Sequence, residues 1–349
     1  MPDLKSTYTI KGKTIKNRLV FPPCVCFNYA GDDGFVTERN IEHYEEMARG
    51  GSGLIIAEAT CISKNGRLHA TQLGIWDDAH VEGLSKIVKA IHAEGAVALL
   101  QIHHAGYKTA ADSAKSEDIF TASDYDLKGT LIRAATSKEV EDVIKGFASA
   151  ALRAHKAGFD GVEIHGAHDY LLSQFLSADV NKRDDEYGKN RLLIHLKVIE
   201  AIKAVVPTDF IIAMRLGAND DSMADGIKYA KELEAAGVDL LNISSGHMRK
   251  PADMEEFDGY HWVCQLGMNI KKHVNIPTIC VFGINSPEAA NEIVKNELCD
   301  FAAAAKGLLA DPNWMVKYEK GEEITPCAKC ERCQFYSDGA ECPIRFRNN

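Results

Sequence analysis

The sequence predicts an α/β protein, namely a (β/α)8 TIM barrel that carries a short Cys-rich C-terminal extension. Two observations favour this fold. Short apolar runs, rich in β-branched residues, alternate with longer segments of helical period from end to end of the 349-residue chain, as strand–helix repeats do. No Gly-rich loop follows the first run, Leu19–Val25, although an open doubly wound sheet that binds a dinucleotide would need one there.

The expected strands are short apolar runs, because strands of a parallel sheet are buried on both faces. They lie at Leu19–Val25, Leu54–Thr60, Ala96–Ile102, Gly161–His165, Phe210–Leu216, Val238–Ser244, Pro277–Val281 and Asp300–Ala304. The expected helices repeat apolar residues at helical spacing. They lie at Glu38–Arg49, Ala79–Glu94, Ser137–Ala157, Asn190–Val205, Met223–Ala236, Trp262–His273 and Pro287–Lys295. Several are followed by glycine, as at Gly158 and Gly237, where a left-handed residue closes a helix.

Composition excludes several classes of protein. Hydrophobic residues make up 46% of the chain and charged residues 26%, which is typical of a globular protein. The net charge of −10 disfavours a phosphate backbone, so we expect no nucleic-acid partner. The N-terminus lacks a basic region followed by an apolar run, and no stretch approaches the roughly 20 apolar residues of a membrane span. We therefore expect a cytoplasmic protein with reduced cysteines and no membrane partner.

The predicted barrel accounts for residues 1–326, and residues 327–349 form a Cys-rich tail that is too short to be a domain. In a barrel of this kind the active site lies at the C-terminal ends of the strands. The longest connections, Ala105–Thr136 and Ser245–His261, both follow strand ends, so both are candidate active-site lids. The oligomeric state stays open, a homo-oligomer included.

The fourth expected strand is followed by the first candidate catalytic group, His165, His168 and Tyr170. Imidazole N–H groups can stabilise an oxyanion that develops on a substrate, and a phenol can then donate a proton. Two histidines three residues apart are also compatible with a metal site, or with polar residues that merely satisfy each other at a strand end. The spacing alone leaves these three interpretations open.

Other strand ends carry polar residues that suit a planar heterocycle and a phosphate. The amide of Gln101 offers both a donor and an acceptor, and Arg215 would place a permanent positive charge beside it. After the seventh and eighth strands come Gly283 and the pair Lys306-Gly307, at positions where barrels frequently bind a phosphate. Each of these residues could instead have a structural role.

Taken together, the chain resembles the Old Yellow Enzyme family of NADH:flavin oxidoreductases, in particular its bacterial ene-reductase and dienoyl-CoA reductase-like branch. The resemblance extends from Lys16 to Pro312. Its most specific blocks are Gly53–Thr60, Leu73–Trp76, Gln101–Gly106, His165-x-x-His168-x-Tyr170, Gln174–Ser177 and Asn181-x-Arg183-x-Asp185-Glu186-Tyr187-Gly188. Where the family usually has Gly-Arg before the last helix, this chain has Ala305-Lys306, which keeps the charge but not the bidentate guanidinium.

The resemblance implies an FMN-dependent ene-reductase in which reduced FMN transfers hydride to the β-carbon of an α,β-unsaturated carbonyl compound. It places Pro23, Ala59, Gln101 and Arg215 around the flavin ring, and Gly283, Lys306 and Gly307 at the FMN phosphate. It also implies that His165 and His168 hold the substrate carbonyl and that Tyr170 protonates the α-carbon. The electron donor would be NAD(P)H or an electron-carrier protein, and the substrate a small activated alkene.

The tail has the ligand spacing of a metal site, Cys327-x-x-Cys330-x-x-Cys333 followed by Cys342-Pro343. A run of cysteines closed by Cys-Pro is similar to the cysteine spacing of bacterial ferredoxins. This similarity favours a [4Fe–4S] cluster. A tetrahedral Zn site is the alternative, and free thiols or disulfides are the third interpretation. With a cluster, we expect a separate protein to supply electrons; with Zn, we expect a structural clip and direct reduction by NAD(P)H.

Two other functions compete with the ene-reductase hypothesis. One is a metal-dependent barrel hydrolase or lyase that uses His165 and His168 as ligands. The other is a non-catalytic electron-transfer protein that uses the tail cysteines. The sequence does not identify the alkene, nor does it distinguish NADH from NADPH.

Overall fold

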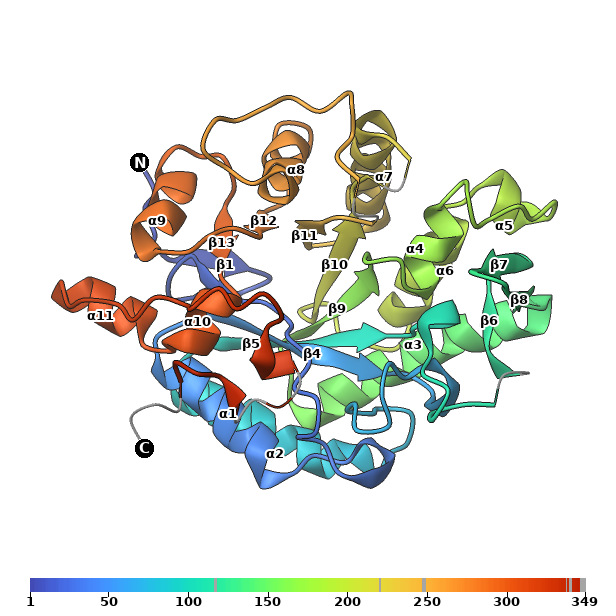
Figure 1. Cartoon of the computed structure of the whole chain (residues 1–349), viewed down its shortest axis with the longest axis horizontal. Coiled ribbons are helices and arrows are strands. Elements are labelled where there is room, and N and C mark those ends of the chain that lie inside the picture. Colours follow the sequence, from blue (N-terminus) through green and yellow to red (C-terminus); the bar gives the residue numbers. More distant parts are fainter. Residues whose placement is uncertain (116–117, 220, 247–248, 337, 339–340, 346–349) are drawn as a thin grey trace.

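A computed structural model describes the chain except for residues 116–117, 220, 247–248, 337, 339–340 and 346–349. Its centre is a closed barrel of parallel strands in the order β10-β11-β12-β13-β3-β4-β5-β9, seen in Figure 1. The strands are β3 (Leu19–Phe21), β4 (Leu54–Cys61), β5 (Val97–His103), β9 (Gly161–Gly166), β10 (Ile211–Gly217), β11 (Leu240–Ser244), β12 (Thr278–Val281) and β13 (Phe301–Ala303). The predicted (β/α)8 barrel is confirmed, with each of its strands where the sequence places it.

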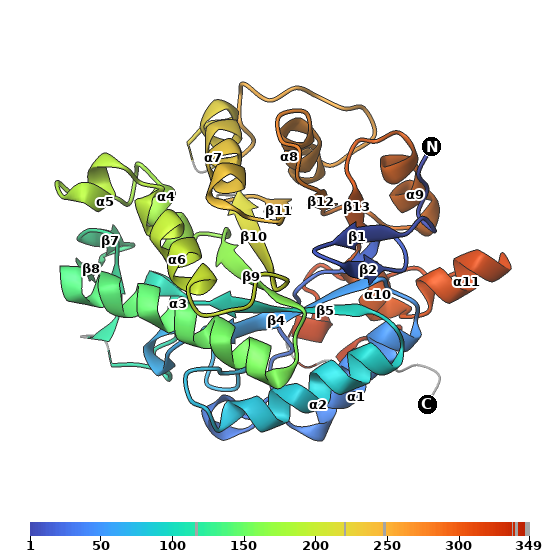
Figure 2. The same ribbon diagram turned by 180° about the vertical axis from the view of Figure 1, so that it is seen from behind.

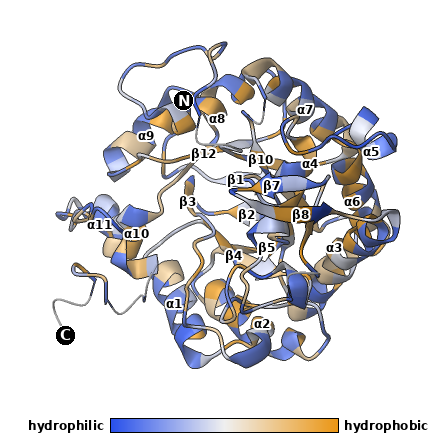
Figure 3. Cartoon of the chain, turned by 45° about the vertical axis from the view of Figure 1, so that its right-hand side comes forward, coloured by the Kyte–Doolittle hydropathy of each residue, from blue (hydrophilic) through white to orange (hydrophobic). Residues whose placement is uncertain are grey.

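The longer helices of the described chain pack around the barrel, as Figure 2 shows from behind. They are α1 (Glu38–Arg49), α2 (His80–Ala93), α3 (Ser137–Ala157), α6 (Leu193–Lys203), α7 (Met223–Ala236), α8 (Trp262–Lys271) and α9 (Pro287–Lys295). The apolar colouring in Figure 3 gathers on the strands and on the inner sides of these helices. Local signals fix their ends: Thr136 and Glu139 form a capping box at the start of α3, and Gly158 (φ 101°) closes it in the left-handed conformation.

Two predicted boundaries differ noticeably from the structure. The first strand ends at Phe21 rather than Val25, because Pro22 and Pro23 have no N–H with which to continue a strand ladder. The helix expected at Asn190–Val205 begins only at Leu193, after a turn in which the side chain of Asn190 accepts a hydrogen bond from the N–H of Leu192. The other boundaries shift by one or two residues, which is ordinary fraying.

Several short elements are absent from the sequence prediction. The hairpin β1 (Tyr8–Ile10) and β2 (Lys13–Ile15) precedes the barrel, and the candidate lid at Ala105–Thr136 contains a small sheet of β6 (Phe120–Thr121), β7 (Tyr125–Leu127) and β8 (Thr130–Ala134). Short helices are α4 (Leu171–Leu176), α5 (Glu186–Lys189), α10 (Lys306–Ala310) and α11 (Trp314–Lys320), with 3-10 turns at Asp32–Gly34, Lys64–Gly66, Gly106–Lys108 and Gln334–Tyr336. Parts of both candidate lids, residues 116–117 and 247–248, lie outside the described residues.

The interior of the barrel changes from apolar to polar along its axis. Alternate residues of the strands, among them Val97, Leu99, Ile211 and Ala213, pack together at the N-terminal end, where Ile10 and Ile15 of the β1–β2 hairpin join them. Because side chains alternate along a strand, the same face continues into polar residues further on. In β5 it continues to Gln101 and His103, and in β10 to Arg215. The polar residues thus collect at the C-terminal end of the barrel.

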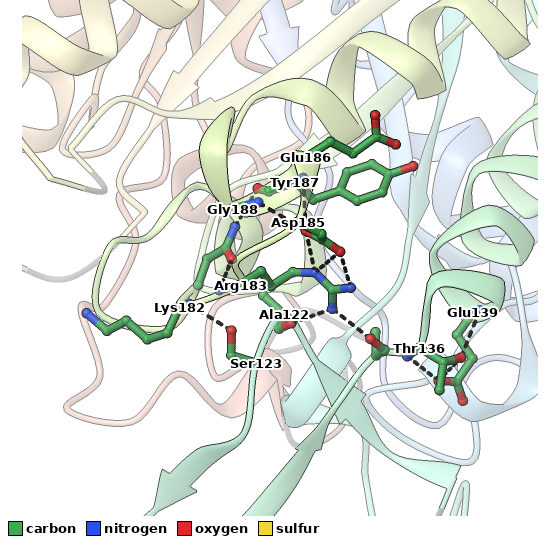
Figure 4. A network of polar contacts seen from close by, with 12 residues as sticks. Ala122, Ser123, Thr136, Glu139, Lys182, Arg183, Asp185, Glu186, Tyr187 and Gly188 are labelled. Atoms are coloured by element: carbon green, nitrogen blue, oxygen red, sulfur yellow. Dashed lines mark hydrogen bonds and ion pairs between the residues drawn. The ribbon is translucent and has the colours of Figure 1, made fainter.

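The block around Arg183 has a structural role. Its guanidinium pairs with Asp185 through Nε (2.9 Å to Oδ2) and Nη2 (2.5 Å), and Nη1 donates to the carbonyls of Ala122 (2.9 Å) and Ala135 (2.6 Å). Figure 4 shows Arg183 between these partners. The side chain of Asp185 also accepts from the N–H of Tyr187 at the start of α5. This network ties the β6–β8 connection to the segment that precedes α6.

The tail packs against α1 rather than standing apart from the barrel, as Figure 1 shows. Phe335 is 1% exposed and its ring lies against those of Tyr29 and His43. Arg345 pairs with Glu46 and reaches Nδ1 of His43 at 3.2 Å. All ten cysteines are free thiols, which leaves no disulfide in the tail. Of the helices that the structure describes, none combines the length and apolar character that a membrane span requires.

Candidate active site

The structure brings His165, His168 and Tyr170 together at the C-terminal end of the barrel. His165 lies at the end of β9, and Tyr170 is the residue that precedes α4. The ring centre of His165 is 5.1 Å from that of His168 and 4.9 Å from that of Tyr170. His168 and Asp169 both adopt positive φ values (59° and 61°). This turn, which is costly for residues other than glycine, returns the chain so that the three side chains face one another.

A chain of hydrogen bonds sets the protonation of the two imidazoles. The N–H of Ala167 donates to Nδ1 of His165 (3.4 Å), so the ring proton of neutral His165 is on Nε2. That Nε2 lies 3.3 Å from Nδ1 of His168, and Nε2 of His168 lies 2.8 Å from Oγ of Ser244 at the end of β11. Burial, aided by the charges of Arg215 and Lys108, lowers the pKa of His168 to about 3. Burial and the neighbouring groups also lower the pKa of His165 well below its usual value, so both imidazoles are neutral at neutral pH.

Tyr170 is held as a neutral phenol. Burial, with a smaller contribution from the charge of Asp169, raises its pKa to about 12. Asp169 itself pairs with Lys108 (3.3 Å) and accepts from the hydroxyl of Tyr107. The ammonium of Lys108 lies 5.4 Å from the ring centre of Tyr170. The phenol therefore keeps its proton until a strong base develops beside it.

His103 is a member of this cluster that the sequence analysis does not assign. Its ring is 4.6 Å from that of Tyr170, edge to face, and 5.3 Å from that of His165. It is fully buried, and neither ring nitrogen has a hydrogen-bond partner among the described residues. Strand alternation gives the signal that could find it, because His103 lies two residues after Gln101 and shares its face of β5. Ser244 is the second unassigned residue, and only its contact with His168 reveals it.

Beneath the histidines, Gln101 and Arg215 flank a buried carboxyl group, that of Glu163. Its two oxygens accept from the amides of Gln101 and Asn242, at 2.7 Å each. Burial raises the pKa of Glu163, and the nearby charge of Arg215 opposes that effect. Arg215 is 5% exposed, and its Nε has no partner among the described residues. A buried donor without a partner is costly, so this position suits a ligand that brings an acceptor.

Ala59 lies on β4, and Pro23 lies in the segment that follows the neighbouring strand β3. Ala59 is 3% exposed and lies within the irregular register of β4 between Ala57 and Thr60. Its carbonyl accepts from the side chain of Gln72 (2.6 Å). Pro23 is separated from the end of the short β3 strand by Pro22 alone. Their roles at a flavin ring stay predictions.

A cavity of about 370 Å³ opens where β12 and β13 end. Gly283 and Lys306 line it, as the sequence predicts for a phosphate site. Phe282 (φ 86°) and Gly283 (φ 77°) are both left-handed, and a Cβ on Gly283 would lie 3.0 Å from Cβ of His261. Gly307 is not among the residues that line this cavity. Its missing Cβ instead leaves room for the ring of Trp314, which would otherwise be 2.1 Å away.

The four tail cysteines converge. Each is half-buried, and Cys327, Cys330, Cys333 and Cys342 line one small cavity of about 20 Å³, together with Lys306 and Phe335. Within the described part of the chain, no group of three or more His, Cys, Asp or Glu side chains has the spacing that a single metal ion needs. This finding also leaves His165 and His168 without a third ligand, which the hydrolase hypothesis requires.

Comparisons with known proteins agree with this geometry. The model of the NADH:flavin oxidoreductase / NADH oxidase family matches residues 6–324. The chain is 38% identical to an NADPH dehydrogenase of Halalkalibacterium halodurans over 323 residues, which cover 89% of this chain and 92% of that protein. It is 38% identical to an NADH oxidase of Thermoanaerobacter brockii over 344 residues, which cover 94% of this chain but 53% of that protein. The chain thus spans about half the length of that relative.

A solved structure gives the same result at the level of the fold. The Old Yellow Enzyme homologue from Zymomonas mobilis superposes with a TM-score of 0.82 and 26% sequence identity. The superposition covers 97% of this chain and 99% of that one.

Proposed function

Because the chain belongs to the NADH:flavin oxidoreductase / NADH oxidase family, whose members include the Old Yellow Enzymes, we propose that it is an FMN-dependent ene-reductase of α,β-unsaturated carbonyl compounds. One observation carries the proposal beyond the family. Two neutral imidazoles, His165 and His168, lie beside a phenol that burial keeps protonated. That set of groups suits a substrate whose carbonyl oxygen gains negative charge while a neighbouring carbon takes up a proton.

The two histidines would bind the substrate carbonyl. Both are neutral, so neither carries a charge before the substrate arrives, and each ring N–H would exchange its present partner, His168 or Ser244, for the substrate oxygen. Their donation strengthens as the oxygen becomes enolate-like, which stabilises the transition state more than the bound substrate. Ser244 keeps the ring of His168 in place through the 2.8 Å contact. Tyr170 would then donate its proton to the α-carbon, and its pKa of about 12 makes transfer unfavourable until that charge exists.

FMN would lie over the polar end of the barrel and supply the hydride. Arg215, whose Nε has no hydrogen-bond partner in the described part of the chain, and the amide of Gln101 are the groups that would hold the ring, with Pro23 and Ala59 beside it. The phosphate would lie in the cavity lined by Gly283 and Lys306. Gly307 supports that site by the packing it allows to Trp314. We propose NAD(P)H as the source of electrons.

The absorption spectrum of the purified protein tests this proposal. We expect a yellow protein that bleaches with NAD(P)H or dithionite under anaerobic conditions and recovers its colour when 2-cyclohexenone is added. A colourless protein, or a reduced flavin that no activated alkene reoxidises, would contradict the proposal. Loss of activity on chelation, with bound divalent metal and no flavin, would instead favour the hydrolase hypothesis.

For the tail we propose a [4Fe–4S] cluster bound by Cys327, Cys330, Cys333 and Cys342. Their ferredoxin-like spacing and their shared cavity support it. Anaerobically purified protein should contain about four irons and four acid-labile sulfides per chain. Stoichiometric zinc without iron would contradict the cluster.

A further inference from the structure

We propose that Lys329, which belongs to the Cys-rich tail, is a second phosphate-binding cation of the FMN site. The inference rests on the proposed binding of FMN and names a ligand of that nucleotide which lies outside the barrel.

The tail contributes to the cavity in which the phosphate would lie. The cavity of about 370 Å³ at the ends of β12 and β13 is lined by barrel residues and by two residues of the tail, Lys329 and Tyr336. The barrel residues are Val281, Phe282, Gly283, Ile284, Asn285, Ala303, Ala305 and Lys306. The tail therefore forms part of the wall of the cavity in which the phosphate would lie.

The charged side chains that line this cavity are positive. Lys306 and Lys329 are the two cations that line the cavity, and no carboxylate is among its lining residues. In the part of the chain that the structure describes, neither lysine forms an ion pair, whereas Lys317 nearby is paired with Asp311 at 2.5 Å. Two unpaired ammonium groups at one cavity suit a ligand that carries about two negative charges, as a phosphate monoester does.

The backbone of Lys329 has a conformation that is unusual for lysine. Lys329 has a φ of 51°, in the left-handed region that glycine adopts freely and other residues at a conformational cost. It lies between Cys327 and Cys330, where a glycine would meet the demand of the tight turn without that cost. Because lysine pays a conformational cost here that glycine would not, its side chain is expected to make a favourable interaction. The cavity that it lines is where a bound phosphate would provide that interaction.

Contacts of Tyr336 tie the tail to the flavin end of the barrel. Its hydroxyl donates to the sulfur of Cys24, which follows Pro23, and the charge of Arg215 acts on the same thiol. Lys306 in turn lines both the phosphate cavity and the cysteine cavity. The cysteine loop thus carries Lys329 to the phosphate while Tyr336 fixes the tail beside the ring site.

The experiment compares FMN with riboflavin, which has the same ring and no phosphate. Holoenzyme is freed of flavin by dialysis, and the dissociation constants for both flavins are measured by fluorescence in wild type, Lys329→Gly, Lys329→Gln and Lys329→Arg. Lys329→Gly removes the charge and the backbone strain together, so its tail should fold at least as well as that of the wild type. Lys128→Gly is the matched control, since Lys128 is also left-handed (φ 53°) but lies in the β7–β8 hairpin.

We expect Lys329→Gly and Lys329→Gln to weaken FMN binding about tenfold, to leave riboflavin binding within twofold, and to lose most of the FMN effect at high salt. Lys329→Arg should stay close to wild type, and Lys128→Gly should not change either constant. Equal FMN affinity in Lys329→Gly and wild type would overturn the inference. So would an equal loss for riboflavin, because it would mean that Lys329 acts on the tail alone. If wild-type protein binds neither flavin, the proposed function fails and the inference falls with it.

Discussion

The barrel mouth, formed by His103, His165, His168 and Tyr170, and the Cys-rich tail both depend on closely spaced residues, but the fold holds them very differently. His165 is 4% exposed and lies on a strand that is paired on both sides. The tail cysteines are half-buried on a chain with little regular structure. A site built on paired strand ends is held by the barrel itself, whereas the described part of the tail is held by contacts such as that of Phe335 with His43.

The largest expected effect tests the mouth of the barrel. Tyr170→Phe removes the proposed proton donor but keeps the ring contacts with His103 and His165. Reoxidation of the reduced flavin by an enone should slow by about 10²–10⁴-fold, while flavin reduction by NAD(P)H stays unchanged. Stopped-flow spectroscopy of the two half-reactions measures both rates. Tyr318→Phe on α11 is the control, and equal reoxidation rates in wild type and Tyr170→Phe would assign the proton to solvent.

The second effect also concerns the mouth. His168→Ala removes one of the two donors proposed for the substrate carbonyl and should lower the rate of alkene reduction by about 10²–10³-fold. The same substitution at the exposed His155 of α3 should leave this rate unchanged. Steady-state kinetics with one enone measures the change. An increase of KM with an unaltered kcat would show that His168 binds the ground state and transition state equally.

The third prediction tests whether the tail is separable from the mouth. Cys330→Ser should abolish stoichiometric binding of iron and sulfide, because a cluster needs all of its thiolates. The rate of alkene reduction by protein whose flavin is reduced with dithionite should change less than threefold, since the mouth does not use the tail cysteines. Iron analysis and flavin reoxidation kinetics give the two readouts. A loss of reoxidation as large as that of Tyr170→Phe would refute this separation. The buried Cys299→Ser is the matched control.

The smallest effect is on stability, through pH. Burial lowers the pKa of His104 to about 4 and that of His168 and His195 to about 3, against an ordinary value of 6.5. Between these values the unfolded chain binds more protons than the folded one, so the free energy of unfolding falls as pH is lowered below 6.5. Each of these imidazoles lowers the free energy of unfolding by at most about 1.4 kcal/mol for every pH unit below that value.

Urea unfolding at pH 7 and pH 5 measures this dependence. We expect a lower midpoint at pH 5, and a smaller difference between the two pH values for His195→Leu, which removes one buried imidazole of α6. The same change at the exposed His155 should leave the difference as in wild type. An unchanged pH dependence in His195→Leu would mean that His195 is not the source of the effect.

Much of the fold and of the site could be predicted because both follow from periodicity along the chain. The eight strands are apolar runs that only a doubly covered sheet can bury, and His165, Arg215 and Lys306 come directly where such runs end. The β1–β2 hairpin and the β6–β8 sheet could not be predicted, because most of their strands mix exposed and buried residues and so form no continuous apolar run. His103 was not assigned although strand alternation places it on the same face of β5 as Gln101, because the alternation was not followed to the end of that strand.

By itself the sequence determined the (β/α)8 barrel, its family and the residues that end its strands, since hydrophobic periodicity and ordered motifs are properties of the chain alone. Only the tertiary structure decided which of those residues meet. It joined His103 and Ser244 to the histidine–tyrosine cluster, removed Gly307 from the lining of the phosphate cavity, and placed Lys329 of the tail in that lining. Contacts between residues far apart in the chain depend on how the barrel closes and where the tail packs, and no local pattern encodes them.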